Sequence, residues 1–163
     1  MIGHICLSDL HLGAPTALLT EVQGAKGPKG GAVAALRDAF SGALVATLKA
    51  LHPAGPPAVK PRLILLGDVL DLSLGTPQDA LAAFDALLKS LADAGARDWL
   101  GPFAFLPGNH DHELWTVTRF QRMAAPAPGA GGAPFRHTTP AFADPGTEPK
   151  AALLDEIVRR HGF

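Results

Sequence analysis

The sequence is poor in cysteine, in charge and in long apolar runs. Of its 163 residues one is a cysteine, Cys6, so the chain forms no internal disulfide. Lysine and arginine number 14 and aspartate and glutamate 15, and a formal net charge of −1 gives no electrostatic case for a nucleic-acid or membrane partner. We find no apolar run long enough to span a bilayer. Disulfide scaffolds, basic nucleic-acid binders and membrane-spanning proteins are therefore not expected.

What the sequence does contain fits a globular chain. Hydrophobic residues make up 47% and charged residues 18% of it, and the length suits a single domain with a real core, which we assign to residues 1–163. An apolar strand pattern begins almost at the N-terminus, which leaves no room for a signal peptide. The expected location is therefore the cytoplasm.

Short apolar runs alternate with longer stretches of helical periodicity. Strands are predicted at residues 2–7, 63–66 and 103–106, and helices at residues 32–51 and 77–94. Strand, helix, strand, helix, strand is the pattern of a parallel sheet with right-handed crossovers. Later helices are predicted up to residue 123 and over residues 151–160. The first helix has an apolar stripe that we expect to pack on the sheet, formed by Val33, Leu36, Phe40, Leu44 and Leu48.

Each predicted strand runs into a polar cluster. The clusters are Ser8-Asp9-Leu10-His11, Gly67-Asp68-Val69-Leu70-Asp71 and Gly108-Asn109-His110-Asp111. Ligands of open α/β sheets bind at the carboxyl edge of the strands, so the three clusters predict one site. Caps and turns would explain any one cluster, but not ligand-type side chains at all three strand ends. Carboxylate and imidazole groups suit manganese, iron or zinc.

Asp9-x-His11, Gly67-Asp68-x-x-Asp71 and Gly108-Asn109-His110-Asp111, in this order, resemble the calcineurin-like metallophosphoesterase family. The resemblance runs from about Ile2 to Asp111. It implies an α/β fold, namely the βαβαβ half of a metallophosphoesterase α/β/β/α sandwich. The later Gly-His-x-His of the family is not found, so we expect a domain that is incomplete at its C-terminus and has weak activity alone.

The resemblance also implies a binuclear metal centre. Asp9 and His11 would bind the first of two divalent metal ions, Asp68 would bridge both, and Asn109 would bind the second through its carbonyl. Manganese is favoured over iron or zinc. A neutral ligand at Asn109 limits the negative charge that faces an anionic substrate.

Two further residues receive catalytic roles from the resemblance. His110 would lie beside the substrate, where it stabilises the phosphoryl oxygens or protonates the leaving group. Asp71 would be the partner that holds the tautomer and charge state of His110. Asp111 closes the motif and is expected to hold its loop.

The implied activity is metal-dependent hydrolysis of a phosphomonoester or phosphodiester by a two-metal mechanism. A phosphodiesterase or small-molecule phosphatase is favoured over a protein phosphatase, because Leu72 stands where protein phosphatases of this superfamily have arginine, and Asp111 where they have glutamate. The alternative is a catalytically impaired fragment, or a non-catalytic binding scaffold of the same fold. The loops at residues 13–31 and 124–144 would set specificity.

The C-terminal part adds three expectations. Residues 124–134 are rich in proline and glycine and predict a flexible linker within the domain. His112, His137 and His161 lack the family context, and surface or pocket-rim roles are favoured over metal ligation for them. A parallel sheet with helices on one face would leave its other face bare, which predicts association into a homo-oligomer.

Overall fold

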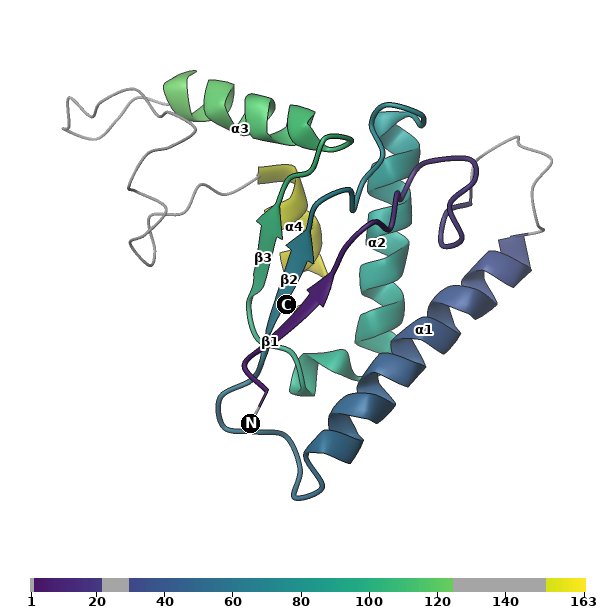
Figure 1. Ribbon diagram of the computed structural model, residues 1–163, viewed down its shortest axis with the longest axis vertical. Helices are drawn as coiled ribbons and strands as arrows, with labels where there is room; N and C mark the ends of the chain where they lie inside the picture. The colour runs from purple at the N-terminus through teal and green to yellow at the C-terminus, as the bar shows by residue number, and fades with distance from the viewer. Residues whose placement is uncertain (1, 22–29, 125–151) are drawn as a thin grey trace.

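A parallel three-stranded sheet forms the centre of the fold (Figure 1). The computed structural model describes residues 2–21, 30–124 and 152–163. The strands β1 (His4–Leu7), β2 (Arg62–Leu66) and β3 (Phe103–Leu106) lie side by side in chain order, with β2 in the middle. Helices α1 (Gly30–Leu51) and α2 (Pro77–Asp93) form the two crossovers. The predicted α/β class and strand–helix alternation are confirmed.

The register of the strands divides the sheet into a packed face and an open face. Ile5 pairs with Leu63, and Leu63 with Phe103, so these side chains share one face. They belong to the hydrophobic core, together with residues from α1, α2 and α4 (Ala152–Arg160). The opposite face carries side chains that are exposed or half-buried, namely His4, Cys6, Arg62, Ile64, Leu66, Ala104 and Leu106. The expected packing of helices on one face is thus seen in the described residues.

Helix α1 packs through a stripe that differs from the predicted one. Val33 and Leu48 are buried as expected, but Leu36 is 42% exposed, and Val45 and Ser41 are buried in addition. Ser41 meets α2 through a hydrogen bond that Ser90 Oγ donates to Ser41 Oγ at 2.9 Å. The placement of Leu36 in the core was therefore wrong, because the first turns of α1 lie beside the loop after β1 rather than over the sheet.

Helix α2 begins and ends where the sequence predicts. The Thr76 side chain accepts a hydrogen bond from Asp79 N at 3.1 Å, and Pro77 occupies the first turn, as expected of an N-cap. Gly95 follows the helix with a φ of 85°, a left-handed conformation that glycine adopts without steric cost. A short 3₁₀ helix, η1 (Ala96–Asp98), comes next and was not predicted.

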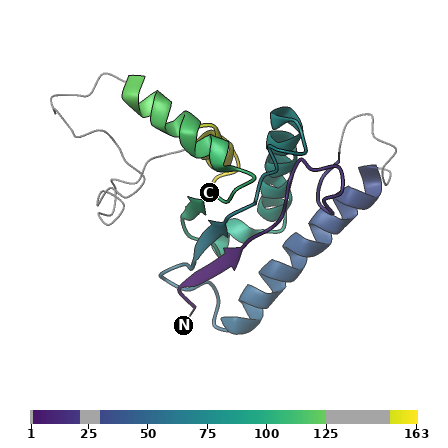
Figure 2. The ribbon, with the colours of Figure 1, turned by 45° about the horizontal axis from the view of Figure 1, so that its top comes forward.

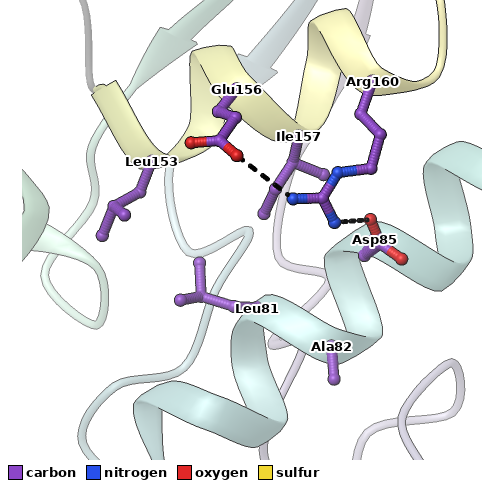
Figure 3. A pocket seen from close by; sticks show the side chains of 7 residues that line it. All are labelled: Leu81, Ala82, Asp85, Leu153, Glu156, Ile157 and Arg160. Atoms are coloured by element: carbon purple, nitrogen blue, oxygen red, sulfur yellow. Dashed lines mark hydrogen bonds and ion pairs between the residues drawn. The ribbon is translucent and has the colours of Figure 1, made fainter.

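Helix α4 lies against α2, and Figure 3 shows the contact. Leu154 and Ile157 are buried, whereas Leu153 is 48% exposed and lines a hollow between the two helices. Arg160 reaches Asp85 on α2 at 3.3 Å. Helix α3 (His112–Ala124) starts at the carboxyl end of the sheet and points away from it (Figure 2). The predicted linker after Ala124 lies outside the described residues.

By length and composition alone, residues Gly31–Leu51 of α1 could cross a membrane. This corrects the expectation that no apolar segment is long enough. Val33, Val45 and Leu48 of this helix pack in the hydrophobic core. One such helix is weak evidence of a membrane span, because core helices of soluble proteins have the same length and composition.

Candidate metal centre

Backbone hydrogen bonds hold the loops that follow the three strands against one another. Asp9 N donates to Gly67 O at 3.1 Å, and His11 N donates to Asp68 O at 2.9 Å. The third loop joins through its own backbone, because His110 N donates to Asp68 Oδ1 at 2.9 Å. The three polar clusters therefore meet at the carboxyl edge of the sheet, as their positions after parallel strands predict.

Three of the predicted ligand residues have a left-handed backbone. The φ angles of Asp9, His11 and Asp68 are 55°, 46° and 50°, and in the described part of the chain no other non-glycine residue has a positive φ. Such conformations are uncommon outside glycine, although aspartate and histidine adopt them more readily than most residues. Backbone strain of this kind concentrates at functional sites. The backbone thus marks the same residues as the sequence motifs do.

Gly108 allows the third loop to approach Asp68. A Cβ atom at this position would lie 2.6 Å from Asp68 N and would also collide with the Asp68 carboxylate. The glycine of Gly-Asn-His-Asp is therefore required by the close passage of two backbones. The sequence placed Gly108 in the motif but gave no sign of this contact.

Asp71 lies between two imidazoles. Its Oδ2 is 3.1 Å from Nδ1 of His11 and 3.1 Å from Nδ1 of His110. Its Oδ1 accepts hydrogen bonds from Ser73 N at 3.0 Å and Leu74 N at 2.8 Å. The contact expected between Asp71 and His110 is present, and the one with His11 is an addition.

The pKa of Asp71 is lowered although its side chain is fully buried. Burial is the largest influence and raises the pKa. The hydrogen bonds from Leu74 N, His110, His11 and Ser73 N together outweigh it. Asp71 is therefore an ionised carboxylate that can hold a proton on either imidazole.

The two imidazoles are in edge-to-face contact. The ring centroids of His11 and His110 are 4.8 Å apart at an interplanar angle of 85°. Because Nδ1 of each ring faces Asp71, Nε2 is the nitrogen that can meet a metal ion or substrate. Ser73 Oγ is also 3.1 Å from His110 Nδ1. Ser73 was not among the predicted site residues, and its position two residues after Asp71 was the signal in the sequence that could have identified it.

Asp111 holds the second and third loops together from inside. Its side chain is fully buried. Oδ2 accepts hydrogen bonds from Val69 N at 2.9 Å and from Leu70 N at 3.3 Å, and Oδ1 accepts one from Gly108 N. The expectation that Asp111 holds its loop agrees with these contacts.

The donor groups at this edge fit divalent metal ions. Asp9, His11 and Asp68 each offer one ligand atom within 4.8 Å of the others, and His11, Asp71 and His110 form a second such group. Carboxylate oxygen and imidazole nitrogen are the donors that manganese, iron and zinc accept. Asn109 lies exposed in the bend between Gly108 and His110. The individual ligand roles of these residues stay predictions.

Two of the later histidines lie in the described part of the chain. His161 Nε2 is 3.0 Å from Asp85 Oδ1, so this imidazole belongs to the contact between α4 and α2. His112 is the first residue of α3, directly after the third loop. His137 lies outside the described residues.

The family model described as calcineurin-like phosphoesterase matches residues 5–153, which include all three polar clusters. No curated protein and no solved structure matched the chain.

Proposed function

The chain belongs to the calcineurin-like phosphoesterase family, and on that premise we propose that it hydrolyses a phosphate ester at the carboxyl edge of its sheet. The observation that carries the proposal is the convergence of Asp9, His11 and Asp68 within 4.8 Å beside the pair of imidazoles on Asp71. The fold, α/β with a parallel three-stranded sheet, is consistent with part of a metallophosphoesterase fold.

The family implies divalent metal ions, and the donor set fits them. We assign Asp9, His11, Asp68 and Asn109 as the residues that would hold two ions, with manganese favoured. When bound, the ions would supply positive charge that stabilises the phosphate oxygens and makes water more acidic. Backbone hydrogen bonds from Asp9 N to Gly67 O and from His11 N to Asp68 O hold the backbone that carries these side chains.

His110 is assigned the transfer of a proton to the leaving group. Asp71 holds a proton on Nδ1 of His110, so that Nε2 can carry the proton that is donated. Water adds to phosphorus, the bond between phosphorus and the leaving oxygen breaks, and His110 gives that oxygen its proton. The proton that the water loses restores the imidazole.

A phosphodiester or small-molecule phosphate ester is the favoured substrate. Protein phosphatases of this superfamily have arginine at the position of Leu72 and glutamate at the position of Asp111. Asp111 is buried among the backbone N–H groups of the second and third loops, so it faces the protein interior rather than a substrate.

The experiment combines metal-dependent stability with turnover. Manganese should stabilise the folded chain by about 3 kcal/mol at a hundredfold excess over Kd, which is seen as a rise in Tm. It should also support hydrolysis of p-nitrophenyl methyl phosphate. Asp68→Asn should remove most of the Tm shift. Asp93→Asn, an exposed aspartate on α2 that pairs with Lys89, is the matched control and should keep it.

His110→Ala separates chemistry from metal binding. We expect it to retain the manganese shift and to lose roughly a hundredfold or more of turnover, as for a positioned acid. Loss of the shift in this variant would identify His110 as a ligand. Metal binding without turnover in the unaltered chain would favour the non-catalytic scaffold over the enzyme.

A further inference from the structure

A groove opens directly beside the candidate metal centre. It has a volume of about 570 Å³, and Asp9, His11 and Asp71 form one end of it. This volume lies within the range of small-molecule sites. The loop after β1, the first half of α1 and Leu74 supply the other walls. A ligand that reaches the metal centre from this side therefore contacts all three segments.

The walls of the groove are apolar and open to solvent. Leu18 is 76% exposed, Leu36 42% and Leu74 65%, and all three line the groove. Single exposed leucines are ordinary on protein surfaces. These three come from a loop, a helix and a second loop, and they gather at one hollow that is continuous with a polar site. An apolar surface arranged in this way marks a ligand-binding groove.

The described residues that line the groove offer little to a polar or multiply charged ligand. No lysine or arginine is among the described residues that line it, and beyond the metal-centre residues Thr16 is the single side chain there with a hydrogen-bonding group. The nearby Arg37 donates from Nη1 to Leu19 O at 3.2 Å, so its guanidinium holds the loop. A second phosphate or a nucleobase would bury polar groups without partners, at a cost in affinity.

We propose that the ester taken by this site carries an alkyl chain, which lies in the groove along Leu18, Leu36 and Leu74 while the phosphate lies at Asp9 and His11. The position of the phosphate in this inference rests on the proposed function, and the position of the alkyl chain rests on the groove. It accounts for the exposure of Leu36, whose spacing on α1 predicted a core position. The substrate would then be an amphiphilic phosphate ester.

The test measures binding of methyl-, butyl- and octylphosphonate to the manganese-loaded 163-residue chain by titration calorimetry. Phosphonates keep the charged head but resist hydrolysis, and all three are used below their micellar concentrations. We expect Kd to fall about twofold per methylene, because an open groove buries part of each group. A Kd that does not change with chain length would overturn the inference, and so would tighter binding of adenosine monophosphate than of octylphosphonate.

Variants locate the effect. Leu36→Gln and Leu74→Gln should each weaken the dependence of Kd on chain length. Leu51→Gln is the matched control, since Leu51 lies at the far end of α1 and is 50% exposed. All three positions are solvent-exposed, and Tm values check that each variant folds. Equal loss in the control and in the groove variants would show nonspecific binding and refute the groove.

The two proposals fail in different ways. Turnover of p-nitrophenyl methyl phosphate, together with phosphonate Kd values that do not change with alkyl length, would support the phosphoesterase and contradict the alkyl groove. Phosphonate Kd values that fall with alkyl length, in the absence of turnover, would support the groove and contradict the enzyme.

Discussion

At the scale of single residues, the site depends on unusual backbone. Asp9, His11 and Asp68 adopt left-handed conformations that cost of order 1–3 kcal/mol each. The cost is offset by hydrogen bonds such as His11 N to Asp68 O at 2.9 Å and Asp9 N to Gly67 O at 3.1 Å. A backbone held in this way keeps the three residues close together, which lowers the cost of ordering them when a ligand binds.

Gly108 provides a prediction at this scale. Gly108→Ala would force apart Asp68 and the third loop, because the new Cβ would lie 2.6 Å from Asp68 N. We expect a loss of about 1–3 kcal/mol in the free energy of unfolding and weaker manganese binding, measured by denaturant titration and by metal-dependent Tm. Gly42→Ala on α1 is the control, since a Cβ there meets nothing within 4 Å, and it should be neutral or stabilising by up to about 1 kcal/mol.

If Gly108→Ala were as stable as the unaltered chain and bound manganese equally well, the loops would not be packed as closely as described. The control is needed because both substitutions also reduce the entropy of the unfolded chain in the same way.

At the scale of elements, α4 is held mainly by apolar contact. Ile157 is 8% exposed, whereas the side chain of Arg160, which pairs with Asp85, is 57% exposed. Burial of an isoleucine outweighs an exposed ion pair. We therefore expect Ile157→Ala to cost about 2–4 kcal/mol and Arg160→Ala less than about 1 kcal/mol, both measured by chemical denaturation. A larger loss for Arg160→Ala would contradict this order.

Elements whose signals are local were predictable from the sequence. The strands at residues 63–66 and 103–106 agree with β2 and β3 to within one residue, and Thr76 caps α2 as its side chain predicts. The side of α1 that faces the core was not predictable in full. Helical spacing places Leu36 on the apolar stripe of α1, but it does not show that this turn of the helix lies beyond the sheet, where Leu36 is 42% exposed. Tertiary position decides this, and spacing carries no information about it.

Some features of the candidate site were likewise predictable from the sequence and others were not. The three motifs predicted which residues meet, because parallel strands bring their carboxyl ends to one edge. They did not predict the left-handed backbone, the second imidazole on Asp71 or the pairing of His161 with Asp85. The two contacts join segments that are remote in sequence, 60 positions apart for His11 and Asp71 and 76 for Asp85 and His161.

At the scale of the whole molecule, Cys6 reports on the open face of the sheet. Its thiol is exposed on β1, and Leu66 and Leu106 on the same face are 47% and 46% exposed. We expect the native chain to react with a disulfide reagent at a rate within about tenfold of the unfolded chain, since reactivity follows access. Protection that increases with protein concentration would support the predicted homo-oligomer, and strong protection at every concentration would contradict an open face.

The all-parallel sheet also determines when the site can appear during folding. His11 and Asp71 are 60 positions apart, and His110 and Asp68 are 42 apart. Pairing of remote segments requires the ordering of long intervening stretches before any contact forms, and such pairing is slow. The unfolded chain therefore presents scattered carboxylates and imidazoles rather than a chelating cluster. A metal ion would act after the strands have joined, by retarding the opening of a completed sheet rather than by guiding its assembly.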